Sequence, residues 1–223
     1  NNNGVNGIYF LNSSNNDLSD ITSNSNGVDG IYFNSSNNRL TRATANSNGG
    51  DGVKTRFGET NNTLMHITAS NNIASGIYPA NNSQLTNITA NNNTYGLSIG
   101  TSNNILINIT ANNNSYYGVW LGGTSTNNTL TNLNINNSWR DAIYLTGTTS
   151  SNSFTNAVVR NTNSSYYDIN FAAEGINGTW IIDSNFANYT FTGAGGLVNF
   201  KDSSYGIVSF LEPINGSGTN LSD

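Results

Sequence analysis

One short motif recurs along most of this chain and constrains its fold more than any other feature. Segment 27–33 (GVDGIYF) repeats segment 4–10 (GVNGIYF) in nearly identical form, and weaker copies follow. The first apolar residue of each copy stands at positions 8, 31, 53, 77, 97, 119, 143 and 169. A period of this size is typical of a solenoid, in which each coil buries its apolar face against the next.

A second landmark divides each repeat. In idealised form it reads Asn-x-Leu-x-x-Ile, as in segment 104–109. Each coil therefore carries two short apolar segments separated by polar turns. These segments are too short for helices and rich in the β-branched and aromatic residues that favour strands. The sequence predicts an all-β parallel β-helix of about eight coils over residues 1–173.

The alternation of side chains along a strand assigns the faces of the coil. We expect Ile31 and Phe33 to point inward and Tyr32 to point outward. Three interior lines follow from the same rule. The first is Ile8, Ile31, Val53, Ile77, Leu97, Val119, Ile143 and Ile169. The second is Leu18, Leu40, Leu64, Leu85, Leu106, Leu130 and Phe154. The third is Ile21, Ala43, Ile67, Ile88, Ile109, Leu133 and Ala157.

Asparagine also recurs at corresponding turn positions. One set is Asn87, Asn108, Asn132 and Asn156, and another is Asn24, Asn46, Asn91, Asn112 and Asn136. An amide side chain carries two donors and an acceptor, so amides stacked at strand spacing can bond to one another along the axis. We expect such ladders to explain why an ordered chain contains so much asparagine.

The period fails after about residue 173. Residues 174–223 contain strand-like segments at 180–182, 197–200 and 205–211 with different spacing. The end of a solenoid exposes core residues and unpaired strand edges unless something covers it. We expect residues 174–223 to form terminal coils and a cap, or the lead-in to a following β domain.

The Asn-rich coil with its GIYF segment resembles the right-handed parallel β-helix repeat of NosD-like proteins and of many archaeal cell-surface proteins. The resemblance covers about residues 1–173, and segment 200–212 is similar to a segment that follows such repeats in archaeal surface proteins. It implies a right-handed solenoid on an extracellular or cell-surface protein. Relatives include structural surface proteins, carbohydrate binders, polysaccharide lyases and hydrolases, so the resemblance implies no single activity.

Composition narrows the classes of function. The net charge is −5 with no basic run, which argues against a nucleic-acid partner. There is no cysteine and only one histidine, so neither a thiolate nor a multi-histidine metal site is available, and we expect no metal or other cofactor. No apolar run of about 18 residues is present, so we expect no transmembrane segment. Because the chain opens within a repeat, we expect it to be part of a longer protein.

Aromatic residues mark the outward position of the first strand. Five of its members are aromatic: Tyr9, Tyr32, Tyr78, Trp120 and Tyr144. Five further tyrosines widen this region on the later coils: Tyr95, Tyr116, Tyr117, Tyr166 and Tyr167. A row of rings suits the apolar faces of a sugar polymer, so a glycan is one predicted partner. The alternative is contact with neighbouring protein subunits, including self-assembly, or simple cross-strand pairing.

Charged residues gather in the early coils and suggest a weaker, catalytic alternative. A lyase would use Asp29 and Asp51 to hold a cation on a substrate carboxylate and Lys54 or Arg56 as the base, although carboxylates one rung apart repel unless paired. Asp20, Arg42 and His66 share a turn position, which predicts a surface salt-bridge ladder of little energetic weight. The candidate glycosidase carboxylates are dispersed over separate coils and the tail: Asp141, Asp168, Glu174 and Asp183.

Glycosylation sequons are frequent, and the main candidates are Asn12, Asn34, Asn61, Asn127 and Asn163. A chain so rich in Asn, Ser and Thr also creates such sequons by chance. Taken together, the residues predict a stiff rod with an exposed aromatic stripe, and the resemblance implies that it is a structural or adhesive module of an extracellular or cell-surface protein. The alternative is a polysaccharide-degrading enzyme, a lyase or glycoside hydrolase.

Overall fold

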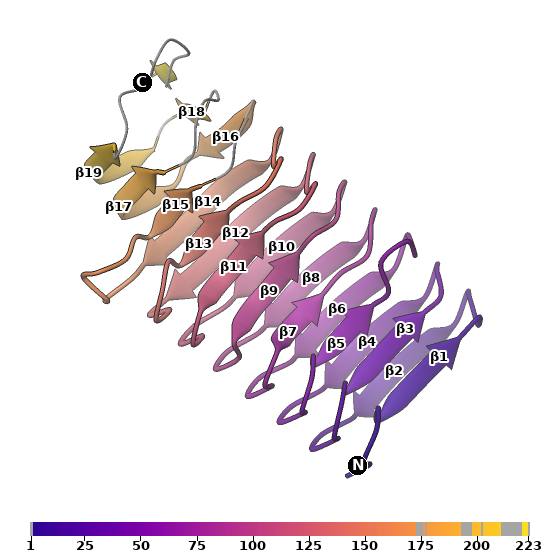
Figure 1. Ribbon diagram of the computed structural model, residues 1–223. Coiled ribbons are helices and arrows are strands. Elements are labelled where there is room, and N and C mark those ends of the chain that lie inside the picture. The colour runs from indigo at the N-terminus through magenta and orange to yellow at the C-terminus, as the bar shows by residue number, and fades with distance from the viewer. Residues whose placement is uncertain are drawn as a thin grey trace.

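The computed structural model describes residues 2–172, 176, 178–192, 198–201, 203–210 and 220–222. Within these residues the chain forms strands without helices, and the strands belong to one continuous parallel sheet that winds around a common axis. Figure 1 shows the coils stacked in chain order, with β1 and the C-terminal strands at opposite ends of the rod. The predicted all-β solenoid is therefore confirmed.

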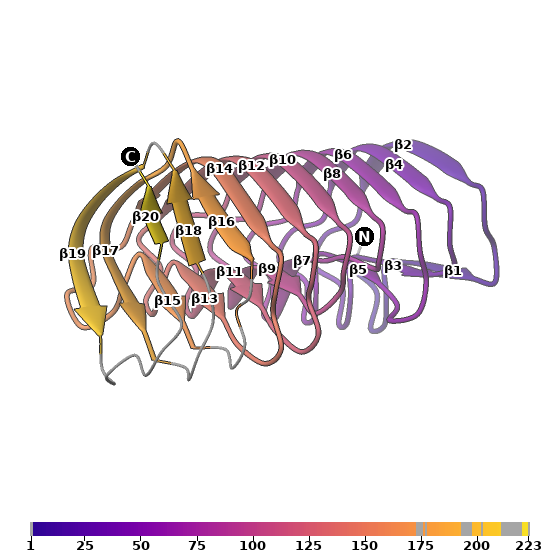
Figure 2. The same ribbon diagram turned by 90° about the horizontal axis from the view of Figure 1, so that it is seen from above.

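Each coil contributes one strand to each of two walls, which Figure 2 separates clearly. The first wall consists of β1 (Ile8–Leu11), β3 (Ile31–Asn34), β5 (Val53–Thr55), β7 (Ser75–Tyr78), β9 (Tyr95–Ile99), β11 (Tyr117–Leu121), β13 (Ile143–Leu145) and β15 (Ile169–Phe171). The second wall consists of β2 (Asp17–Thr22), β4 (Arg39–Thr44), β6 (Thr63–Thr68), β8 (Gln84–Thr89), β10 (Ile105–Thr110), β12 (Thr129–Asn136) and β14 (Ser153–Arg160).

The core consists of the predicted interior lines. Ile31 and Phe33 are fully buried, whereas Tyr32 between them is half-buried and faces outward. All three lines are in register from coil to coil, as Ile8↔Ile31 and Leu106↔Leu130 illustrate. Apolar side chains thus repeat at the spacing of hydrogen-bonded strands and fill the interior without gaps in the pattern.

A left-handed residue in each second-wall strand allows both Leu and Ile of the Asn-x-Leu-x-x-Ile motif to point inward. Two residues separate these side chains, and strict alternation would turn one of them to solvent. The second of the two residues has positive φ in every coil: Asp20, Arg42, His66, Asn87, Asn108, Asn132 and Asn156. Asparagine tolerates this conformation better than most residues, which explains its recurrence there.

The predicted amide ladder is present on the exterior at this left-handed position. Nδ2 of Asn108 donates to Oδ1 of Asn87, and Asn132 and Asn156 continue the chain with bonds of 2.8 and 2.7 Å. At the second predicted position, side-chain oxygens accept main-chain N–H groups of the next coil, as from Asn46 to Asn24 at 2.7 Å.

Two further ladders are buried at the turns, and the sequence analysis did not assign them. One runs through the asparagines that begin the Asn-x-Leu-x-x-Ile motif, including Asn104, Asn128 and Asn152. The side-chain oxygen of Asn128 accepts the main-chain N–H and the side-chain amide of Asn104, and that of Asn152 accepts the same groups of Asn128. The other runs through the opposite corner and includes Asn26, Asn48 and Asn72. These bonds satisfy turn N–H groups that the walls leave unpaired.

The parallel stacking continues beyond residue 173. The later strands are β16 (Thr179–Ile182), β17 (Asn185–Phe191), β18 (Val198–Lys201), β19 (Ser204–Phe210) and β20 (Asn220–Ser222). β16 pairs with β14, and β18 and β20 extend that wall. The sequence period changes here because the single strand β17 spans both walls: its first residues pair with β14 and its last residues pair with β15.

Candidate binding face

The outward side chains of the first wall form one row along the rod. Register pairs Tyr9 with Tyr32, Tyr32 with Lys54, and Lys54 with Tyr78. Farther along, Trp120 pairs with Ser98 on one side and with Tyr144 on the other. The structure therefore brings the predicted aromatic residues onto one face, where Ser98 separates an early group from a later one.

The early group is a pair of stacked rings beside a cation. The centroids of Tyr9 and Tyr32 lie 5.1 Å apart with an interplanar angle of 17°, and Tyr9 is 48 % exposed. Lys54 Nζ lies 5.9 Å from the Tyr32 centroid. Arg56 takes a different place: its Nη1 donates to Asn34 Oδ1 at 2.9 Å, and Asn34 Nδ2 donates to the Tyr9 hydroxyl at 3.1 Å.

The later group is larger and more tightly packed. Trp120 lies 5.8 Å from Tyr95, and Tyr144 stacks on Tyr117 at 4.5 Å and 24°. Tyr116 contacts both Tyr95 and Tyr117, edge to face. Burial raises the pKa of Tyr117 to about 12, although a hydrogen bond with a neighbouring arginine acts against the rise. These rings form a half-buried surface that is apolar at its centre and carries hydroxyl groups.

Asp29, Asp51 and Lys54 do come together, as the catalytic alternative requires. Lys54 Nζ lies 3.0 Å from Asp51 Oδ2 and 3.9 Å from Asp29 Oδ2. The other oxygen of each carboxylate has a structural partner: Asp29 Oδ1 accepts the N–H of Asp51, and Asp51 Oδ1 accepts the N–H of Ser75, both at 2.8 Å. The two carboxylates thus extend a turn ladder as well as holding the lysine.

The protonation of this cluster follows from its burial. Desolvation raises the pKa of Asp29, against the opposing effects of the Asp51 N–H and the Lys54 charge. Desolvation also opposes the charge on Lys54, but the carboxylate of Asp51, aided by that of Asp29, outweighs it and raises the pKa of the lysine. Lys54 is therefore protonated at neutral pH and poorly suited to accept a proton as a general base.

The remaining charged candidates have structural roles. Asp20 and Arg42 form the predicted surface ion pair at 2.7 Å, and its hydrogen bonds lower the pKa of Asp20 to about 2. His66 continues this row by contacting the amide of Asn87 at 3.3 Å. The Asp141 carboxylate is buried and accepts the Tyr167 N–H at 2.9 Å.

Asp168 is also buried, and it accepts main-chain N–H groups of Asn161, Ala187 and Asn188. Asp183 is exposed, and Glu174 lies outside the described residues. In the part of the chain that the structure describes, no group of three or more potential metal ligands occurs.

The sequon asparagines differ in exposure. Asn12, Asn61 and Asn127 are exposed, and Asn163 is half-buried with its amide bonded to the Trp139 carbonyl. Asn34 is only 8 % exposed, and both polar atoms of its side chain are engaged in the hydrogen bonds described above. Geometry therefore favours modification at the first three positions over Asn34.

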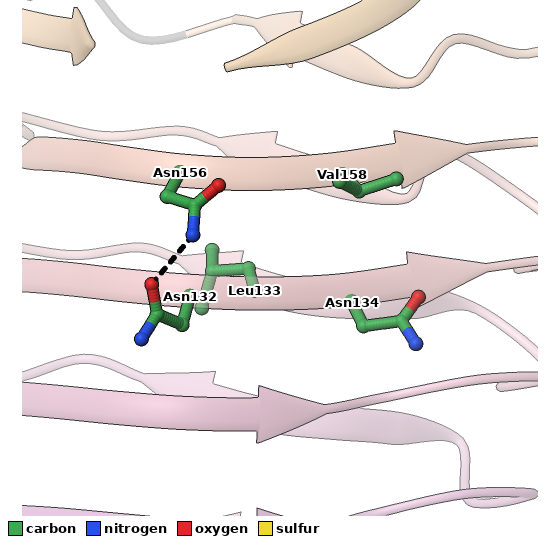
Figure 3. A pocket seen from close by; sticks show the side chains of 5 residues that line it. All are labelled: Asn132, Leu133, Asn134, Asn156 and Val158. Carbon is green, nitrogen blue, oxygen red and sulfur yellow. Dashed lines mark hydrogen bonds between the residues drawn. The ribbon is translucent and has the colours of Figure 1, made fainter. Parts of the chain in front are cut away.

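A shallow hollow of about 350 Å³ lies on the second wall (Figure 3). It is lined by Asn132, Leu133, Asn134, Asn156 and Val158, and the Asn132–Asn156 bond of the outer ladder crosses it. The hollow lies on a different wall from the aromatic row, because its residues belong to β12 and β14. The described residues contain no helix that is long and apolar enough to span a membrane.

A chain with these parallel in-register walls and internal stacks is a parallel β-helix protein. The family model described as "Right handed beta helix region" matches residues 1–132, and the chain belongs to that family. The right-handed β-helix implied by the sequence resemblance is thus confirmed. The sequence matches none of the curated proteins with which it was compared.

Solved structures show the same fold. The A-module of mannuronan C-5 epimerase AlgE4 from Azotobacter vinelandii superposes with a TM-score of 0.64 at 13 % identity, covering 98 % of this chain and 77 % of that chain. The full-length tailspike protein 2 of Escherichia coli O157:H7 bacteriophage CAB120 gives 0.61 at 12 % identity, covering 89 % of this chain. This chain spans only 35 % of the tailspike. At such identities the likeness concerns the fold alone.

Proposed function

We propose that this β-helix is a structural or adhesive module of an extracellular or cell-surface protein and that its aromatic row binds an extended glycan. The observation that carries the proposal is the register of Tyr32, Tyr78, Trp120 and Tyr144 on one face. Outward side chains in a sheet repeat about 4.8 Å apart from strand to strand. A linear polymer that follows the axis can therefore contact the rings of alternate coils, and those of the adjacent Trp120 and Tyr144, with its sugar residues.

The chemistry of the rings supports a sugar rather than an apolar ligand. Each tyrosine presents a flat apolar face together with a hydroxyl group that donates and accepts hydrogen bonds. Sugars present the complementary combination of C–H faces and hydroxyl groups. One solved structure with this fold is a mannuronan C-5 epimerase module, and another is a phage tailspike protein. These names agree with the proposal but do not carry it.

The test replaces Tyr32, Tyr78, Trp120 and Tyr144 by Ala, singly and together, and measures retention on immobilised neutral and acidic polysaccharides by affinity electrophoresis. We expect the combined variant to lose retention and the single variants to weaken it. Trp180→Ala is the matched control, because Trp180 is an outward, 42 % exposed ring on β16, away from the row. Unchanged retention in the combined variant, or no retention of the wild type by any polysaccharide, contradicts glycan binding.

The same variants distinguish contact with protein subunits. If the row is an assembly surface, the wild type associates at high concentration in analytical ultracentrifugation and the combined variant sediments as a monomer, without any effect on polysaccharides. Loss of association alone would replace the glycan with a second copy of the chain as the partner of this face.

A polysaccharide lyase is the second candidate, favoured by the cluster of Asp29, Asp51 and Lys54 beside Tyr78. Incubation with acidic polysaccharides should then yield unsaturated ends that absorb ultraviolet light, and Lys54→Ala should abolish them. The ion pairs of Lys54 argue against this activity, and the absence of such product from a broad panel eliminates it.

A further inference from the structure

Arg140 is the cation of the later aromatic group, and it lies between rings of adjacent coils. Its guanidinium carbon is 4.0 Å from the centroid of Tyr116 and 5.9 Å from that of Tyr166. Trp139, the preceding residue, is 61 % exposed, and its ring centroid lies 6.3 Å from that of Tyr166. A charged, planar group is thus embedded in an exposed aromatic surface.

The main chain explains this placement. The N–H of Arg140 donates to the carbonyl of Tyr116 at 3.0 Å, and the N–H of Trp139 donates to that of Asn114 at 2.9 Å. Arg140 therefore occupies the same position in its coil as Tyr116 in the coil before, and stacking of the two side chains follows from the register. Coils without an arginine at this position lack the cation.

No carboxylate neutralises Arg140 within ion-pair distance in the described chain, where the ion pairs involve Arg39, Arg42 and Lys54. The carboxylate of the adjacent Asp141 instead accepts the Tyr167 N–H and the Asn170 amide. Burial raises the pKa of Asp141, and the charge of Arg140 is among the effects that oppose this rise. The Nε atom of Arg140 is buried without a hydrogen-bond partner among those residues.

The Tyr116 ring, 4.0 Å from the guanidinium carbon, holds the charged group in place. A hydrogen bond with the neighbouring Tyr117 hydroxyl raises the pKa of Arg140. The contrast with the early group is clear, because there one ammonium, that of Lys54, faces two carboxylates. Among the described residues, the cation of the early group is thus paired with carboxylates, whereas that of the later group has none within ion-pair distance.

We propose that Arg140, with Tyr116 and Trp139, forms a subsite for the carboxylate of an acidic sugar residue. The proposal rests on the glycan-binding function proposed above and specifies its substrate class. A guanidinium matches a planar carboxylate with two parallel hydrogen bonds, and it keeps this ability while stacked on a ring. The exposed Trp139 ring offers a face for the sugar ring that carries the carboxylate.

The experiment uses oligogalacturonate, oligomannuronate and oligoglucuronate, each beside its fully methyl-esterified form, and measures affinity by calorimetry. The acid and its ester share ring and hydroxyl groups but differ in charge. We expect the wild type to bind at least one acid about tenfold or more tightly than its ester. Arg140→Gln should abolish this preference by weakening acid binding much more than ester binding, and Arg140→Lys should restore only part of it, because an ammonium lacks the planar fork.

Arg42→Gln is the matched control, since it makes the same change of charge on the exposed part of the second wall. If the esters bind as tightly as the acids, or if Arg140→Gln leaves the preference intact, the carboxylate subsite is wrong while glycan binding stands. If neither acids nor esters bind but neutral polysaccharides are retained, the subsite is likewise wrong. If nothing is retained, the glycan-binding function itself fails.

Discussion

Asn128 gives the most direct test of the buried amide ladder. Its side chain is fully buried and makes four hydrogen bonds. Oδ1 accepts from the main-chain N and the Nδ2 of Asn104 at 2.9 and 3.0 Å, and Nδ2 donates to the Thr101 carbonyl and to Asn152 Oδ1, both at 3.0 Å. Asn128→Ala removes all four bonds and leaves their partners in a site that excludes water.

The expected cost follows from these partners. A neutral hydrogen bond contributes about 0.5–1.5 kcal/mol net, so four bonds bound the loss at about 2–6 kcal/mol. Part of the loss is offset, because Asn152 Oδ1 still accepts the N–H of residue 128 at 3.0 Å and Asn104 Nδ2 still donates to Thr101 Oγ1 at 3.0 Å. The main-chain N–H of Asn104 has no such second partner among these bonds. We expect the free energy of unfolding to fall by about 3 kcal/mol.

Urea unfolding followed by circular dichroism measures this loss. Coils of a solenoid can unfold in steps, so hydrogen exchange of the amides around residue 104 should accompany it. The control is Asn132→Gly in the exposed ladder on β12, the strand that follows Asn128, where glycine retains the left-handed conformation (φ 57°) and only solvent-exposed bonds are lost. We expect less than about 1 kcal/mol there. A loss for Asn128→Ala no greater than that of the control would refute the reasoning.

Three further predictions concern charge, packing and ionisation. Burial raises the pKa of Asp29, so the folded state binds a proton at this carboxyl more readily than the unfolded state does, and the ionised carboxylate lowers stability above that pKa. Asp29→Asn keeps an acceptor for the Asp51 N–H and should raise the urea midpoint at pH 7. This gain should disappear as the pH falls through the pKa of Asp29. Leu106→Ala opens a cavity in a fully buried line and should cost about 2–5 kcal/mol in urea unfolding. Because burial raises the pKa of Tyr117 to about 12, Tyr117→Phe should remove one late component of a spectrophotometric tyrosine titration and leave the components of the exposed tyrosines in place.

The walls of the solenoid could be predicted because their signal repeats. An inward position such as Ile31, Val53 or Ile77 recurs in every coil, and a one-residue error in one repeat would break the pattern of the others. The aromatic row could be predicted for the same reason, since Tyr32 lies between two inward residues. The partner proposed for these rings depends on single positions and has no periodicity to reveal it.

The buried ladders and Arg140 were missed for opposite reasons. Asparagine occupies so many turn positions that frequency alone does not tell Asn128, which points inward, from Asn132, which points outward. The signal was the fixed spacing of Asn128 two residues before the inward Leu130, which most other coils share. Arg140 has no counterpart in the other coils, and only the structure shows that its neighbour Tyr116 lies one rung away.

Two glycines beside the aromatic row lie against its rings, which agrees with the binding role proposed for the row. A Cβ on Gly122 would lie 2.2 Å from Trp120 Cζ2, and a Cβ on Gly100 would lie 3.3 Å from the Tyr78 hydroxyl oxygen. The indole therefore occupies space that only glycine leaves free, and the phenol rests close against a second glycine. Side chains that are already ordered lose less conformational entropy when a ligand binds. A rigid rod with fixed rings is thus better suited to an extended, repetitive polymer than to a small ligand that needs an enclosing pocket.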